Sequence, residues 1–121
     1  MTAEDACTIY FNPRCSKCRG AKAILDEQGV ATEVVQYLVE APGRAELERL
    51  MGLLGIDDPR EMMRTGEPVY GELGLAGAGR DELLDAIAAH PILLERPIVV
   101  RGDRAVIGRP PERVLELLGE G

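Results

Sequence analysis

The stretch FNPRCSKCRGAK, residues 11–22, decides the fold, because it joins a predicted strand to a predicted helix through a pair of cysteines. Before the pair, the run CTIYF (residues 7–11) is rich in β-forming residues and predicts a short strand. After it, residues 16–28 carry apolar side chains at helical spacing and stop at a glycine, which predicts a helix. Cys15 and Cys18, spaced C-x-x-C, therefore fall where the strand gives way to the helix.

The surroundings of the pair are cationic, although the chain as a whole has a net charge of -7. Four basic residues and no acidic one accompany the cysteines within residues 6–25: Arg14, Lys17, Arg19 and Lys22. The unpaired backbone amides at the start of a helix stabilise a thiolate, and the cations act in the same direction. We therefore expect a lowered pKa for Cys15, with Cys18 one helical turn away and within disulfide reach.

Outward from this stretch, residues 32–37 predict a second strand, which completes a β-α-β unit with parallel strands. The middle of the chain is helical. Leu47 to Leu54 follow the helical repeat, DPRE at 58–61 resembles a capped helix start, and residues 80–89 predict a further helix. The glycine-rich stretch between them, residues 65–79, predicts a loop.

The last third predicts a β-hairpin and a final helix. Gly102-Asp103 marks the hairpin turn between PIVV and AVIG, so the tripeptide Arg-Gly-Asp is interpreted as turn sequence rather than as an adhesion ligand. The final helix begins at Pro110-Pro111 and ends at Gly119.

A strand followed by C-x-x-C at a helix start is the redox signature of thioredoxin-like folds. In these folds a proline before the third strand lies across from the cysteines, usually after a cis peptide bond, and Pro97 is the candidate. The predicted fold is therefore a single α/β domain over residues 1–121, thioredoxin/glutaredoxin-like. It has a mixed four-stranded sheet, flanking helices and a helical insertion at about residues 40–90.

Other interpretations of the reactive side chains are less favourable. A zinc site would need two more ligands, and only Cys7 and His90 remain, neither at ligand spacing. Cys7 lies between apolar neighbours and is expected to be a core thiol, while His90 is expected to cap a helix end. The methionines at 51, 62 and 63 are expected to fill the core.

Composition limits the class of protein. No basic, apolar leader begins the chain and no apolar run is long enough to span a membrane, so we expect a soluble cytoplasmic protein in which thiols are kept reduced. The acidic pI of about 4.7 argues against nucleic acid as a partner. The default oligomeric state is a monomer.

Beyond these features, the sequence resembles the arsenate reductases of the glutaredoxin-like class, the ArsC family. The resemblance covers nearly the whole chain in collinear order. It is carried by IYFNPRC at 9–15, EPVYGELGLA at 67–76, HPILLERPIVV at 90–100 and GRPPERVLELL at 108–118.

The resemblance implies the residues of a site. It identifies Cys15 as the nucleophile and Arg64, Arg96 and Arg109 as ligands of the arsenate oxyanion. Asn12 and Arg19 are added as substrate contacts. Thiolate attack on arsenic would give an adduct that Cys18 or an external thiol resolves, with release of arsenite. No bound cofactor is implied, and reducing equivalents are expected from glutathione with glutaredoxin, or from thioredoxin.

Two departures from the family pattern matter. Phe11 stands where well-known members have a histidine thought to hold the cysteine as a thiolate, so activation must come from the helix start and its cations. Cys18 is present where members that use glutathione often lack a second cysteine, which favours an intramolecular Cys15–Cys18 disulfide. Two other functions remain open: a redox-switch transcription regulator of the Spx type that binds RNA polymerase, and a general thiol–disulfide oxidoreductase.

Overall fold

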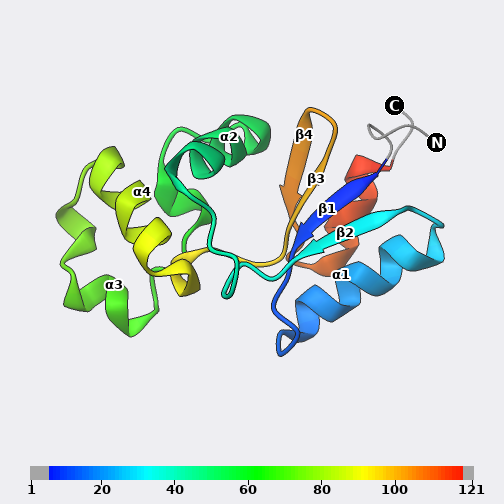
Figure 1. The fold of residues 1–121 in the computed structure, drawn as a ribbon, viewed down its shortest axis with the longest axis horizontal. Helices are drawn as coiled ribbons and strands as arrows, with labels where there is room; N and C mark the ends of the chain where they lie inside the picture. Colours follow the sequence, from blue (N-terminus) through cyan, green and yellow to red (C-terminus); the bar gives the residue numbers. More distant parts are fainter. Residues whose placement is uncertain (1–5, 119–121) are drawn as a thin grey trace. The chain divides into compact units, whose positions relative to one another are not determined.

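The computed structural model describes residues 6–118, and these fall into two compact units. The first, here called the sheet unit, combines Met1–Tyr37 with Arg96–Gly121. The second, here called the helical unit, is the intervening segment Leu38–Glu95. Figure 1 shows both units.

The sheet unit is built on four short strands: β1 (Cys7–Tyr10), β2 (Thr32–Val35), β3 (Ile98–Arg101) and β4 (Arg104–Ile107). Their order across the sheet is β2-β1-β3-β4. The β1–β2 pair is parallel, joined through helix α1 (Ser16–Glu27), whereas β3 runs antiparallel to both β1 and β4. The predicted mixed four-stranded sheet is confirmed (Figure 1).

One face of the sheet is covered by α1 and the C-terminal helix η5 (Pro111–Leu117). Apolar side chains from three strands and both helices form a single core: Cys7, Ile9, Ala21, Leu25, Val99, Val106, Val114 and Leu117. The α1 residues recur at helical spacing and the β1 residues alternate, so each element presents one apolar face to the other. Cys7 is 1% exposed, which confirms it as a core thiol.

The hairpin and the final helix lie where the sequence predicts them. Gly102 turns the hairpin with φ of 61°, a left-handed conformation that favours glycine. The final helix starts at Pro111 as predicted, but it is a 3₁₀ helix rather than an α-helix. Its predicted end, Gly119, lies outside the described residues.

The helical unit contains α2 (Arg44–Leu54), α3 (Pro68–Glu72) and α4 (Arg80–Ala89). Two short 3₁₀ turns lie between them, η2 (Pro59–Met62) and η3 (Leu75–Gly77), and a third, η4 (Pro91–Leu93), follows α4. All three predicted core methionines are at most 5% exposed. His90 closes α4 through its backbone N–H, which donates to the carbonyl of Ala86 at 2.8 Å, while its side chain is exposed.

One prediction for this unit is confirmed and another is wrong. Asp58 is the N-cap and Pro59 the first residue of the helix start predicted at 58–61. The DPRE segment forms one 3₁₀ turn, in which the carboxylate of Asp58 accepts from the backbone N–H of Arg60. The predicted loop at residues 65–79 contains both α3 and η3. Arg60 accounts for the order there, because its guanidinium donates to the hydroxyl of Tyr70 at 3.0 Å and to the carbonyl oxygens of Leu75 at 2.7 Å and Ala78 at 2.9 Å.

No helix among the described residues has both the length and the apolar character needed to cross a membrane.

A close contact in the sheet unit connects the end of β4 to the start of β3. The backbone N–H of Gly108 donates to the carbonyl of Pro97 at 2.8 Å. A Cβ at position 108 would lie 3.0 Å from Cγ of Pro97 and 3.4 Å from Cγ1 of Val114. The site therefore has no room for a side chain at this glycine.

We predict that Gly108→Ala lowers the free energy of unfolding by about 1–3 kcal/mol, because the added methyl overpacks a buried contact. The matched control is Gly52→Ala inside α2, where an added Cβ meets nothing within 4 Å. That change should raise stability by about 0.8–1 kcal/mol. Urea unfolding of both variants measures the difference, and equal stability of the two would contradict the overpacking argument.

Candidate functional site

The sheet register brings three separate chain segments to one edge of the sheet unit. Tyr10 at the end of β1 is paired with Ile98 at the start of β3, which is paired with Ile107 at the end of β4. The loop that carries Cys15 follows β1, the dipeptide Arg96-Pro97 precedes β3, and Arg109 follows β4. Antiparallel pairing therefore places the segments that carry Cys15, Arg96 and Arg109 at the same edge of the sheet.

Cys15 is the N-cap residue of α1, with extended backbone angles (φ −91°, ψ 119°). The loop ahead of it is closed by its own hydrogen bonds. The backbone N–H of Cys15 donates to the carbonyl of Asn12 at 2.9 Å, and the Asn12 side-chain oxygen accepts from the N–H of Arg14 at 3.0 Å. These two hydrogen bonds of Asn12 close the loop and hold Cys15 at the helix start.

The Cys15 thiol is half-buried, and its pKa reflects two opposing effects. Burial by itself raises the pKa, because it penalises the charged form. Hydrogen bonds to the sulfur outweigh burial and lower the pKa from 9.0 to about 7. In order of size they come from the backbone N–H of Cys18, the Arg96 guanidinium, the Cys18 thiol and the backbone N–H of Lys17.

Cys18 behaves in the opposite way, although it lies only one turn along the same helix. It is completely buried, and burial is the largest cause of a pKa raised to about 12. The N–H of Asn12 opposes this shift, whereas the hydrogen bond to Cys15 and the charge of Cys15 add to it. With a pKa of about 7, Cys15 is about half ionised at neutral pH, and its thiolate form accepts a hydrogen bond from the protonated Cys18 thiol.

Arg96 and Arg109 are neighbours. Nη1 of Arg109 donates to the backbone carbonyl of Arg96 at 3.1 Å. Burial tends to lower the pKa of the Arg96 guanidinium, but its hydrogen bond to the Cys15 sulfur is among the effects that raise it overall. The Arg96-Pro97 peptide bond is cis, as predicted, and so is the unpredicted Arg109-Pro110 bond.

Arg19, predicted as a substrate contact, lies on α1 and contacts the loop before Cys15. Its Nη1 donates to the carbonyl of Pro13 at 2.8 Å, which ties α1 back to the loop in front of Cys15. Its described contact therefore supports the conformation of that loop.

Arg64 belongs to the helical unit, where two carboxylates lie close to its guanidinium. Its Nε lies 3.0 Å from Glu67 Oε2, and its Nη1 lies 3.6 Å from Glu95 Oε1. Its backbone N–H donates to the carbonyl of Leu93 at 2.7 Å. Arg64 is therefore held by two residues, Leu93 and Glu95, of the segment that leads directly into Arg96 in the chain.

Sequence reasoning missed the two carboxylates that flank Arg64. A signal was present, because Glu67 follows Arg64 by three residues and Glu95 adjoins Arg96. It also missed Gly108. This position excludes a side chain because Pro97 packs against it, and that contact is visible only in the folded structure.

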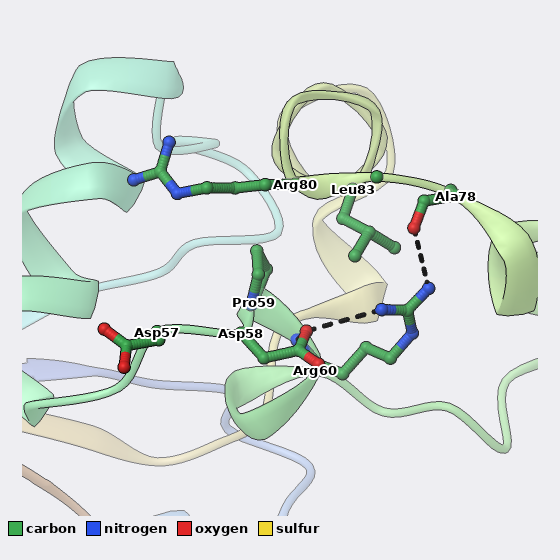
Figure 2. Close-up of a pocket in the computed structure, with 8 residues that line it drawn as sticks. Asp57, Asp58, Pro59, Arg60, Ala78, Arg80 and Leu83 are labelled. Atoms are coloured by element: carbon green, nitrogen blue, oxygen red, sulfur yellow. Dashed lines mark hydrogen bonds and ion pairs between the residues drawn. The ribbon is translucent and has the colours of Figure 1, made fainter.

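The helical unit contains a pocket of about 280 Å³, whose charged lining residue Arg60 holds the local backbone in place (Figure 2). Its lining residues are Asp57, Asp58, Pro59, Arg60, Ala78, Gly79, Arg80 and Leu83. None of these was predicted as a site residue, and the Arg60 guanidinium is engaged with the carboxylate of Asp58 and the carbonyl of Ala78. Among residues 6–118, no three His, Cys, Asp or Glu side chains gather as a metal site would require.

Comparison with known proteins identifies the family to which this chain belongs. The model of the ArsC family matches residues 10–117. An arsenate reductase of Neisseria meningitidis is 47% identical over 112 residues, which cover 91% of this chain and 96% of the relative. An uncharacterized protein of Escherichia coli, YfgD, is 49% identical over 92% of this chain and 95% of its own length. The solved structure of an arsenate reductase from Vibrio cholerae superposes with a TM-score of 0.89 at 48% identity, covering 92% of this chain and 96% of that one.

The geometry predicts a large difference in reactivity between Cys15 and Cys18. In the reduced protein, iodoacetamide should alkylate Cys15 with a midpoint near pH 7 and leave Cys18 unmodified below pH 9, because only the thiolate reacts. Arg96→Gln removes one of the hydrogen bonds to the sulfur and should raise the Cys15 midpoint by about 1 unit.

The matched control is Arg113→Gln, an exposed arginine of η5 paired with Glu116, which should leave the midpoint unchanged. Peptide mass mapping across pH 5–10 provides the measurement. An unchanged midpoint in the Arg96 variant would show that the amides of the helix start and the Cys18 thiol activate Cys15 without Arg96.

Proposed function

Because the chain belongs to the ArsC family, we propose that it is an arsenate reductase with Cys15 as its nucleophile. The observation that carries this proposal is the half-buried thiol of Cys15, which is ionised near neutral pH and hydrogen-bonded to the guanidinium of Arg96. A nucleophile and an anion ligand are therefore adjacent. This is what attack on an oxyanion requires.

Three arginines are proposed as the arsenate ligands. Guanidinium forks match pairs of oxygens on a tetrahedral oxyanion and form charge-assisted hydrogen bonds with them. Support for Arg96 and Arg109 comes from their neighbouring positions at the edge that also carries Cys15. Support for Arg64 comes from its anchoring on the segment that leads directly into Arg96.

Glu67 and Glu95 bear on how Arg64 would act. Both carboxylates are close to its guanidinium, and the three side chains are between 19% and 26% exposed. They orient the guanidinium and also offset its charge, so an oxyanion at Arg64 competes with two carboxylates. A substrate with two negative charges is the kind of ligand that meets this competition.

The first chemical step is attack by the Cys15 thiolate on arsenic. A sulfur–arsenic bond forms, one oxygen leaves as water after protonation, and arsenic stays pentavalent. The guanidinium groups stabilise the charge that develops on the remaining oxygens. Phosphate has a similar shape and charge, but phosphorus does not accept the two electrons of the next step, so chemistry provides the selectivity.

In the second step, Cys18 attacks the sulfur of Cys15. A disulfide forms, the sulfur–arsenic bond breaks, its electron pair stays on arsenic, and the Cys18 proton passes to an arsenic-bound oxygen, so that arsenic leaves as arsenite. Before the first step, the charge on Cys15 helps to keep Cys18 protonated. Bonding of the Cys15 sulfur to arsenic removes the charge on that sulfur, which is one of the smaller contributions to the raised pKa of Cys18; burial, the largest contribution, remains.

A thiol reductant then reopens the disulfide, and the enzyme needs no bound cofactor. Glutathione with glutaredoxin, or thioredoxin, is the proposed donor. In place of a histidine, Phe11 precedes Asn12 and packs against the core of the sheet unit. Activation of Cys15 is accordingly attributed to the start of α1 and to Arg96.

The role of Cys18 is tested by counting thiols. Reduced protein mixed with arsenate, with phosphate as the control, should lose two thiols with arsenate only, and peptide mapping should place the disulfide at Cys15–Cys18. Cys18→Ser should stop after the first step and turn over only when an external thiol is added. If that variant keeps full turnover with glutathione and glutaredoxin, Cys18 is not the resolving thiol.

The arginine ligands are tested by conservative substitution. We expect Arg96→Lys, Arg109→Lys and Arg64→Lys each to lower kcat/KM for arsenate by about 10- to 100-fold, because each removes a charge-assisted, forked hydrogen bond. Arg113→Lys, on the exposed face of η5, is the control and should keep wild-type kinetics. Wild-type kcat/KM in the Arg64 variant would show that Arg64 is not an arsenate ligand.

A further inference from the structure

The residues proposed for arsenate reduction are divided between the two units. The nucleophile, the guanidinium bonded to it and the second thiol (Cys15, Arg96 and Cys18) all lie in the sheet unit. Among the proposed arsenate ligands, only Arg64 lies in the helical unit. A reaction that needs no third guanidinium would therefore require the sheet unit alone.

We propose that this cysteine pair also reduces hydrogen peroxide and small organic hydroperoxides, with Cys15 as the peroxide-reacting thiolate and Cys18 as the resolving thiol. Peroxide is small and uncharged, so it does not need three cations for binding. It needs a thiolate that solvent reaches and a donor that stabilises the departing oxygen. Cys15 is half-buried rather than enclosed, and Arg96 is already in contact with its sulfur.

In the first step, the Cys15 sulfur attacks one peroxide oxygen. A sulfur–oxygen bond forms and the oxygen–oxygen bond breaks. The distal oxygen leaves with the electron pair, takes up a proton and becomes water, or an alcohol from an organic hydroperoxide, while Cys15 becomes a sulfenic acid. A guanidinium has five N–H donors in a planar fork, so Arg96 is suited to contact the sulfur and the leaving oxygen together.

In the second step, Cys18 attacks the sulfenic sulfur. A sulfur–sulfur bond forms, the sulfur–oxygen bond breaks, and the hydroxide that leaves takes the Cys18 proton to give a second water. The two thiols thus supply the two electrons that the peroxide accepts. A dithiol reductant restores the thiols, as it would after arsenate reduction.

The placement of Cys18 also suits this cycle. Its thiol is hydrogen-bonded to Cys15, and its burial shields it from direct oxidation. The sulfenic acid would therefore form beside its resolving thiol, so that disulfide formation precedes oxidation to the irreversible sulfinic acid.

The test mixes reduced, full-length protein with hydrogen peroxide in buffer free of reductant. Free thiols, intact mass and dimedone labelling are followed by rapid quench. The expected rate constant per thiolate is about 100-fold above that of N-acetylcysteine, because a fixed donor contacts the leaving oxygen. Both thiols should be lost together as a Cys15–Cys18 disulfide, while Cys18→Ser should stop at a one-oxygen adduct that dimedone traps.

Two variants separate this activity from arsenate reduction. Arg96→Lys should lower the rate per thiolate by about 10-fold or more, after correction for its own Cys15 pKa. Arg64→Gln should lower arsenate turnover and leave the peroxide rate unchanged, because peroxide carries no negative charge for this guanidinium to bind. Arg113→Lys serves as the control in both assays.

A rate per thiolate equal to that of N-acetylcysteine would overturn the inference, as would sulfinic acid forming ahead of the disulfide. An equal loss of both activities in Arg64→Gln would also contradict it. The two proposals fail separately: thiol loss with peroxide but not with arsenate would remove the proposed reductase and leave the peroxidase, and the reverse result would do the opposite.

Discussion

The contact between the Cys15 thiolate, the amides at the start of α1 and the Arg96 guanidinium is the interaction on which the rest of the site depends. Burial opposes ionisation at both cysteines, and the local donors decide which of them ionises. One thiolate and one thiol, hydrogen-bonded to each other, follow from a spacing of three residues on one helix. That asymmetry supports the order proposed for the two-step oxidation, in which the Cys15 thiolate reacts first and the Cys18 thiol resolves.

Charge is distributed unevenly along the chain, which explains how an acidic protein keeps a cationic neighbourhood around its cysteines. The helical unit, Leu38–Glu95, carries twelve acidic and five basic residues, so it accounts for the whole net charge of -7. The segments of the sheet unit carry nine of each. Within them, the basic residues at 14, 17, 19 and 22 surround the pair with no acidic residue among residues 6–25. The lowered pKa of Cys15, however, comes from backbone amides, the Arg96 guanidinium and the Cys18 thiol, and not from the side chains of these four residues.

Much of the fold was predictable because its signals are local. The strand before Cys15, the helix ending at Gly29, the helix at residues 80–89 and the hairpin turn at Gly102 all lie where the pattern puts them. The miss at residues 65–79 has a tertiary cause. Glycines there predict a loop, but Arg60 binds carbonyl oxygens of that stretch from a position more than a dozen residues earlier. A local pattern carries no record of such a partner.

The same division applies to the site. The sequence by itself determined that Cys15 begins a helix, that cations surround it, and that a proline and arginines stand at the starts and ends of later strands, since each of these is a matter of spacing. Only the tertiary structure decided that Arg96 bonds the Cys15 sulfur, that Arg19 supports the loop through Pro13, and that Glu67 and Glu95 hold Arg64. These are contacts between segments, and they exist only after antiparallel pairing and packing have brought distant residues within reach.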